Sequence, residues 1–93
     1  MAIKSFKCSE TEALYEGERV QQFVNIEAVA LRKLAMLNRA ATLDDLRVPP
    51  GNRLEPLKGK RQGQYSIRIN DQFRVCFRWG QGDATDVEIT DYH

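Results

Sequence analysis

The sequence predicts a small α+β domain in which two N-terminal helices pack on one face of an antiparallel sheet, in the order β-α-α-β-β-β. Two observations lead to this fold class. Apolar residues recur at helical spacing only in the first half of the chain, and they alternate with polar residues only in the second half. Because 93 residues suffice for one core, residues 1–93 are expected to form a single domain.

The first expected elements are a short strand at residues 3–6 and a helix that follows it. Ser9 is placed to cap this helix, and Glu12, three residues later, completes the pattern of a capping box. Gly17 is expected to lie at the helix end, because glycine readily adopts the left-handed conformation found there.

A longer amphipathic helix is expected next, with Asn25 as its candidate cap. Its apolar stripe consists of Ile26, Val29, Ala30, Leu34, Leu37 and Ala41, whereas Arg32, Lys33 and Arg39 are expected to face solvent. This pattern favours a core-packing helix, and the alternative is a helix whose charged side binds a partner or RNA. Thr42 can cap a further turn, and the loop that follows begins at Pro49, Pro50 and Gly51.

The second half of the chain predicts the strands. Residues 53–57 are expected to form an edge strand interrupted by Pro56, followed by a basic loop and then a hairpin. Tyr65, Ile67 and Ile69 alternate with polar residues in the first hairpin strand, and Phe73, Val75, Phe77 and Trp79 do so in the second. Turns are expected at residues 70–72 and 80–83, and residues 85–92 form the last strand, with Val87 and Ile89 inward.

The net charge of +1 conceals a segregation of charge along the chain. Residues 53–78 contain seven basic and two acidic residues, whereas residues 79–93 contain four acidic residues and no lysine or arginine. Alternation puts Arg68, Arg74 and Arg78 on one face of the sheet, a pattern that favours a phosphate-bearing partner. Arg74 pairing with Glu88 across the sheet is the alternative to a role in binding.

Several classes of protein fit the sequence poorly. The longest apolar runs are far below the roughly 20 residues of a membrane span, and the N-terminus lacks the features of a signal peptide, so a cytoplasmic protein is expected. A single histidine and no clustered cysteines argue against a metal site, and no cofactor is expected. Cys8 and Cys76 lie far apart in the sequence, which favours two reduced thiols over a disulfide.

The remaining polar residues suit the cleavage of RNA without a metal. The 2′-hydroxyl of RNA is an internal nucleophile, so a protein must supply a base, an acid and cations that stabilise the charge on the phosphorane. Arginine matches phosphate oxygens with its planar fork, and histidine acts as acid or base near neutral pH. The candidates are Glu55, Lys58, Lys60, Arg61, Arg68, Arg74, Arg78, Asp91, Tyr92 and His93. A simple RNA-binding module is the alternative, because basic strands occur in many proteins that are not enzymes.

Residues 53–79, with their PLKG motif and SIRxNxxxR hairpin, and the ending Asp91-Tyr92-His93 together resemble the HigB branch of the RelE/ParE toxin superfamily. The resemblance covers nearly the whole chain. It implies a ribosome-dependent, metal-independent endoribonuclease that cuts mRNA and so inhibits translation. It also implies a helix-turn-helix antitoxin of the HigA type as partner, with operator DNA bound only through the toxin–antitoxin complex.

The same resemblance assigns roles to residues of this chain. Lys58 and Arg74 match positions that bind phosphate in the family, and Asp91, Tyr92 and His93 match its terminal catalytic cluster. Lys60, Arg61, Arg68 and Arg78 are further candidates for contacts with the RNA backbone. Glu55 stands where many members have a histidine, and a carboxylate there can accept a proton but adds negative charge beside the phosphate. A non-enzymatic inhibitor of DNA gyrase, as in the ParE branch, is the alternative function.

Overall fold

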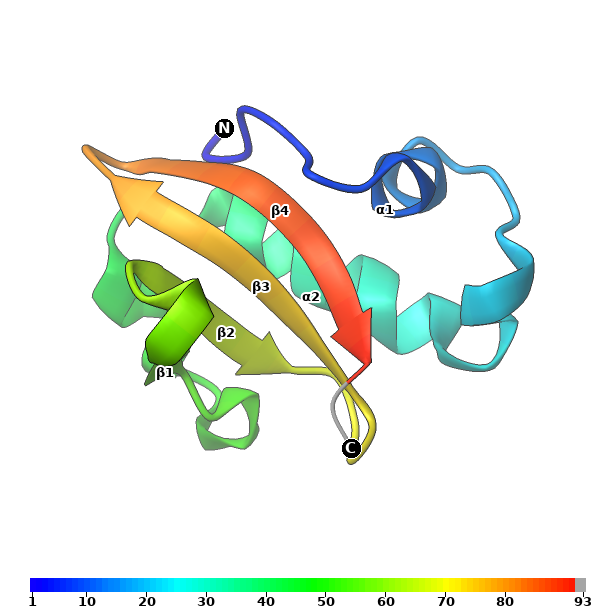
Figure 1. Ribbon diagram of the computed structural model, residues 1–93. Coiled ribbons are helices and arrows are strands. Elements are labelled where there is room, and N and C mark those ends of the chain that lie inside the picture. Colours follow the sequence, from blue (N-terminus) through cyan, green and yellow to red (C-terminus); the bar gives the residue numbers. More distant parts are fainter. Residues whose placement is uncertain (92–93) are drawn as a thin grey trace.

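The computed structural model describes residues 1–91, in which a four-stranded antiparallel sheet lies against helices (Figure 1). The strands are β1 (Glu55–Pro56), β2 (Gln64–Arg68), β3 (Phe73–Gly80) and β4 (Asp83–Asp91), and they lie in this order across the sheet. The helices are α1 (Ser9–Tyr15) and α2 (Glu27–Arg39), with 3-10 turns η1 (Gln21–Ile26), η2 (Leu43–Arg47), η3 (Pro50–Asn52) and η4 (Gly59–Arg61). The expected α+β class is therefore confirmed.

Helix α1 begins at Ser9, one residue earlier than the expected capping box would place its start. Cys8 is the residue before the first turn, and no side chain caps the helix there, so the assignment of Ser9 as cap is wrong. The thiol of Cys8 instead contacts the carboxylate of Glu10 at 3.2 Å. The expected end is correct: Glu16 follows the last helical residue, and Gly17 adopts a φ of 98° that suits glycine.

Helix α2 supplies the apolar layer behind the sheet (Figure 1). Ala30, Leu34 and Leu37 are fully buried, as the stripe predicted. Asn25 does not cap the helix, because residues before Glu27 wind as a 3-10 turn, and Ala41 is exposed because the helix ends at Arg39. Within residues 1–91 no helix is long and apolar enough to cross a membrane.

The expected first strand is not a regular strand. Residues 3–6 run parallel to β4 and touch it at two isolated bridges, one between Ile3 and Ala84 and one between Phe6 and Val87. A bulge in β4 explains this interruption: Asp86 adopts a φ of 51°, and two β4 residues stand opposite one residue of β3. The bulge also allows Ala84 and Val87, three positions apart, to be buried on the same side.

Both predicted turns are present, and each has a local cause. In the first, the Asn70 side-chain oxygen accepts hydrogen bonds from the N–H groups of Gln72 and Phe73, at 2.9 and 2.7 Å. In the second, Gln81 and Gly82 both have positive φ, at 54° and 79°, as a tight hairpin turn with right-handed twist requires. Strand β4 begins at Asp83, two residues earlier than expected, because this turn is only two residues long.

The sheet is covered on both sides. Val75, Phe77, Val87 and Ile89 form the core with α2 and α1, as the alternation predicted. We call the opposite side the outer face; it carries Gln64, Ser66, Arg68, Arg74, Cys76, Arg78, Glu88 and Thr90. Ser66 and Cys76 are fully buried there, because the chain from residue 53 to residue 63 folds over this face, with η4 in front of the sheet in Figure 1. The expected edge strand shrinks to Glu55–Pro56, and just beyond it the N–H of Leu57 donates to the carbonyl of Gln64 at 2.8 Å.

Candidate active site on the outer face of the sheet

Arg74 is the most tightly held cationic side chain on the outer face. Its Nε donates to the hydroxyl of Ser66 at 2.7 Å, and its Nη2 donates to the backbone carbonyl of Arg53 at 2.7 Å. The same Nη2 lies 3.0 Å from a carboxylate oxygen of Glu55. The side chain of Arg74 is only 12% exposed, so its guanidinium is held in one place on the outer face. Ser66 and the Arg53 carbonyl are partners that sequence reasoning missed.

The partners of Arg74 follow from the strand register. Arg68 on β2 stands directly opposite Arg74 on β3, an unfavourable pairing of like charges. The two side chains separate: Arg68 turns to Asp71 in the adjoining turn, and Arg74 turns along the strand to Ser66, its diagonal neighbour. Glu55 on β1 stands directly opposite Ser66 on β2, so its carboxylate also lies beside the Arg74 guanidinium.

The remaining arginines of the outer face are also paired with carboxylates. Arg61 donates to Glu88 at 2.8 Å and to the side-chain oxygen of Gln64 at 3.2 Å, and Arg78 lies 3.4 Å from Asp86. The alternative pairing of Arg74 with Glu88 does not occur, because Arg61 of the covering loop takes that carboxylate. Arg61 therefore ties the η4 loop to the sheet.

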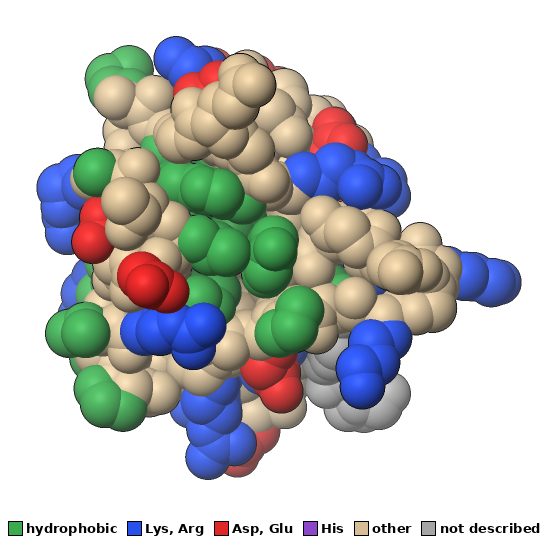
Figure 2. All heavy atoms as spheres, turned by 90° about the vertical axis from the view of Figure 1, so that its left-hand side faces the viewer, with side chains coloured by type: hydrophobic (Ala, Val, Ile, Leu, Met, Phe, Trp, Pro, Cys, Tyr) green, Lys and Arg blue, Asp and Glu red, His purple; other side chains and the backbone are tan. Residues whose placement is uncertain are grey.

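The segregated charges of the sequence meet in space. Because the acidic strand β4 is the antiparallel neighbour of β3, its Asp86 and Glu88 lie beside cationic side chains of the basic segment. Figure 2 shows one side of the molecule, on which basic side chains surround an apolar centre and several have acidic side chains next to them. The surface is thus less positive than the charge balance of residues 53–78 implied.

Lys58 and Lys60 differ from these arginines. Both are exposed, one just before and one within η4, in the loop that covers the outer face. In the part of the chain that the structure describes, neither lysine forms an ion pair. Together with Arg53, which is also exposed, they carry the charges of this covering segment that remain available to an anionic ligand.

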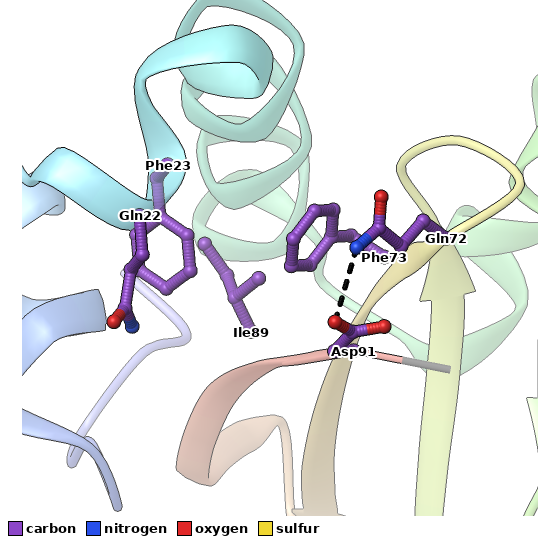
Figure 3. A pocket seen from close by; sticks show the side chains of 6 residues that line it. All are labelled: Gln22, Phe23, Gln72, Phe73, Ile89 and Asp91. Atoms are coloured by element: carbon purple, nitrogen blue, oxygen red, sulfur yellow. Dashed lines mark hydrogen bonds between the residues drawn. The ribbon is translucent and has the colours of Figure 1, made fainter. Parts of the chain in front are cut away.

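An open pocket of about 370 Å³ lies at the end of the sheet that leads to the C-terminus (Figure 3). Phe23 from η1, Phe73 from β3 and Ile89 from β4 form its apolar wall, with the two rings edge to face at 6.2 Å. Gln72 donates from its side-chain amide to Asp91 at 3.0 Å across the rim. Neither Phe23 nor Gln72 was a candidate, because their positions in η1 and in a turn gave no chemical pattern.

Asp91 lies on the pocket side, not beside Arg74. The register pairs Asp91 with Phe73 and pairs Thr90 with Arg74, so Asp91 shares the side of Ile89, as strict alternation requires. Tyr92 and His93, the other members of the expected terminal cluster, lie outside the described residues. The structure thus brings Glu55 and Arg74 together and separates them from Asp91. Among residues 1–91, no three His, Cys, Asp or Glu side chains are grouped to hold a metal ion.

Comparison with known proteins identifies the family. The model of a family described as RelE-like toxin of type II toxin-antitoxin system HigB matches residues 4–93. Toxin HigB-1 of Vibrio cholerae is 42% identical over 91 residues, which is 96% of this chain and 95% of that protein. Endoribonuclease HigB of Proteus vulgaris is 42% identical over 41 residues, covering 44% of this chain and 45% of that protein.

Two solved structures share the fold at low sequence identity. The YoeB dimer from Staphylococcus aureus has a TM-score of 0.55 at 18% identity, and the match covers 100% of this chain and 97% of the YoeB chain. The YoeB/ParE toxin from Agrobacterium tumefaciens has a TM-score of 0.51 at 18% identity, with 100% of both chains covered. Since the family match spans nearly the whole length of the protein, this chain belongs to the HigB-like family of RelE-like toxins of type II toxin–antitoxin systems.

Proposed function

We propose that this toxin is an endoribonuclease that cuts mRNA on the ribosome and thereby inhibits translation. The observation that carries the proposal is the arrangement around Arg74, whose guanidinium is fixed by Ser66 and by the Arg53 carbonyl and lies beside Glu55. A cation held in this way is preorganised to stabilise developing charge on a phosphate, because it need not reorganise during the reaction. The activity named for the Proteus vulgaris relative supports the same chemistry.

The reaction we infer uses the RNA's own 2′-hydroxyl as nucleophile. Arg74 stabilises the phosphorane, and Lys58, exposed in the loop over the outer face, adds a second positive charge. Glu55 occupies the position of a common family histidine and lies beside Arg74, so its carboxylate is our candidate for the proton acceptor. Asp91, Tyr92 and His93 are proposed to complete the acid–base set, with histidine as a donor to the 5′-oxygen leaving group.

The charge pattern of the site supports the proposed dependence on the ribosome. Arg61, Arg68, Arg74 and Arg78 are each paired with a carboxylate of the protein, so the outer face attracts free RNA only weakly. Neutralisation of phosphate charge dominates the affinity of proteins for nucleic acids. A toxin of this kind therefore needs another macromolecule to hold its RNA substrate in place. A ribosome that presents the messenger in its A site fills this need, and it places the activity in the cytoplasm.

Membership of the family implies an antitoxin partner. We propose that this antitoxin is of the HigA type, with a helix-turn-helix domain, and that operator DNA is bound by the complex through the antitoxin. The toxin alone is then expected to show no tight binding to operator DNA in a mobility-shift assay. A tight complex between operator and isolated toxin would contradict this part of the proposal.

The test is to map mRNA 5′ ends after brief expression of the wild type, of Arg74→Ala and of Arg47→Ala. Arg47 is the matched control, because it too is paired with a carboxylate, Asp44, but lies in η2 away from the sheet. We expect new 5′ ends within translated frames for the wild type and for Arg47→Ala, and none for Arg74→Ala. Growth arrest without new ends in any variant would redirect the function to gyrase, and a supercoiling assay would follow.

A further inference from the structure

A lysine of α2 occupies an unusual position at the edge of the sheet. Lys33 was expected to face solvent, yet it is partly buried, and its Nζ donates to the side-chain oxygen of Asn52 at 2.5 Å. Burial lowers the pKa of Lys33, and the nearby charges of Arg32 and Arg68 lower it further. Within residues 1–91, no carboxylate forms an ion pair with this amine. A leucine or methionine would fill the same space without desolvating a charge.

Asn52 is the anchor that this lysine reaches. It is fully buried at the end of η3, its side-chain nitrogen donates to the carbonyl of Leu46 at 3.1 Å, and its own N–H donates to the carbonyl of Pro49 at 3.0 Å. Through its side chain and its backbone, Asn52 therefore joins three parts of the chain, namely α2, η2 and the loop that leads to β1. Two contacts cross from α2 to this loop: the charged one from Lys33, and a weak one at 3.9 Å from the side-chain nitrogen of Asn52 to the sulfur of Met36.

The loop that Asn52 anchors carries two of the three acceptors around Arg74. Arg53, the next residue, adopts a left-handed conformation with φ of 47°, an uncommon one for a residue with a side chain. In this conformation its carbonyl accepts from Arg74 Nη2 at 2.7 Å, and two residues later Glu55 meets the same nitrogen at 3.0 Å. A shift of Asn52 would move the Arg53 carbonyl, which belongs to the next residue. It would leave in place Ser66 of β2 and also Glu55, which is paired with Ser66 in the sheet.

From these contacts we infer that Lys33 and Asn52 are positioning residues for Arg74: they fix the loop whose Arg53 carbonyl orients the guanidinium. This inference rests on the proposed function of Arg74 in RNA cleavage. It explains why a lysine stands at a place where packing alone favours an apolar residue. Lys33 touches no substrate in this scheme and acts through the loop.

The direct readout is the Arg74 side chain in NMR spectra of the isolated toxin. In the wild type, the Nε–H of Arg74 should exchange slowly with water, and rotation of its Nη groups should be hindered. In Lys33→Met, rotation of the Nη2 group should become fast while the Nε–H bond to Ser66 persists. Freely rotating Nη groups in the wild type would overturn the inference without any variant, so the test does not depend on Lys33→Met being folded.

The second readout is cleavage of mRNA on purified ribosomes. For folded Lys33→Met we expect kcat to fall on the order of 10- to 100-fold, as misplacing a reacting group does, with KM nearly unchanged. Lys33→Arg, which restores a donor, should recover most of the loss. Arg32→Met is the matched control, because it removes one exposed positive charge from the neighbouring position of α2 and should leave kcat near the wild-type value.

The outcomes separate the two proposals. A merely structural lysine would change the melting temperature of Lys33→Met but leave its kcat per folded molecule and its Arg74 signals as in the wild type, and this result would overturn the inference. Absence of cleavage by the wild type would instead overturn the proposed function, whereas the Arg74 signals would still decide whether Lys33 positions that side chain.

Discussion

Replacing Glu55 by glutamine tests whether the protein's own carboxylate competes with RNA phosphate for Arg74. In the free protein, Glu55 lies 3.0 Å from Arg74 Nη2 and so occupies the direction from which a phosphate oxygen would approach. Glu55→Gln keeps the size of the side chain and removes its charge. A phosphate that binds at Arg74 then no longer has to displace a carboxylate, so the variant should bind single-stranded RNA more tightly at low salt.

The magnitude follows from counterion release. One additional phosphate neutralised by the protein changes the slope of log K against log salt concentration by about −0.7 for a single strand. The structural cost of the substitution should be small, because the Glu55 side chain is 59% exposed and ion pairs of this kind contribute about 0–1 kcal/mol. Glu55→Gln should therefore remain folded, with a salt slope steeper by about 0.7.

The assay is fluorescence anisotropy with an RNA oligonucleotide whose 2′-hydroxyls are replaced by hydrogen, so that binding is measured without cleavage. Asp44→Asn is the control, because it removes the same charge beside Arg47, in η2 and outside the site. An equal change of slope in both variants would mean that net charge alone is responsible, and an unchanged slope in Glu55→Gln would refute the competition. If Glu55 is also the proton acceptor, the tighter-binding variant should cleave mRNA more slowly.

Three further predictions concern the support of the site and of the fold. Ser66→Ala removes the buried acceptor of Arg74 Nε, so we expect about a tenfold slower cleavage of mRNA with RNA affinity retained, measured in the two assays above. Leu34→Ala should lower the free energy of unfolding by about 2–5 kcal/mol in urea titrations, because Leu34 is fully buried between α2 and the sheet. The N–H groups of Thr42 and Ala41 hold the pKa of Asp45 below its usual value. The ionised carboxylate therefore adds stability above the pKa of the unfolded chain, and this contribution is lost as pH falls through the lowered pKa of the folded state. Asp45→Asn should thus melt at lower temperature than the wild type at pH 7, and the difference should shrink in acid.

The elements of the fold could be predicted from local patterns, because each pattern is contained within a few neighbouring residues. The alternation in β2 and β3 and the stripe of Leu34 and Leu37 correspond directly to the observed core. Apart from the two helix caps assigned to Ser9 and Asn25, which were wrong locally, the errors occurred where a residue depends on a distant one. Residues 3–6 fail to form a strand because of the bulge at Asp86, which lies about 80 positions away and has no glycine to mark it.

The partners within the candidate site were less predictable for the same reason. Alternation correctly grouped Arg68, Arg74 and Arg78 on one face, but it says nothing about a loop folding over that face. Ser66 could have been noticed as a small hydroxyl diagonal to Arg74 once the hairpin register was known. The helical pattern predicted that Lys33 is exposed. Its partial burial becomes understandable only with the hydrogen bond to Asn52, a buried residue that follows a Pro-Pro-Gly turn far along the chain.

The charge pattern shows how the sequence and the fold together determine the properties of the site. In the sequence, the basic segment and the acidic segment look like separate binding surfaces for different partners. In the fold they are adjacent strands, and the carboxylates of Asp86 and Glu88 neutralise Arg78 and Arg61. What remains is one half-buried, oriented arginine beside a carboxylate, together with Arg53 and two lysines that are exposed in the covering segment. Under the proposed function, such a site captures RNA from solution poorly but suits a phosphodiester that is delivered to it. This is the physical reason to expect that cleavage depends on the ribosome.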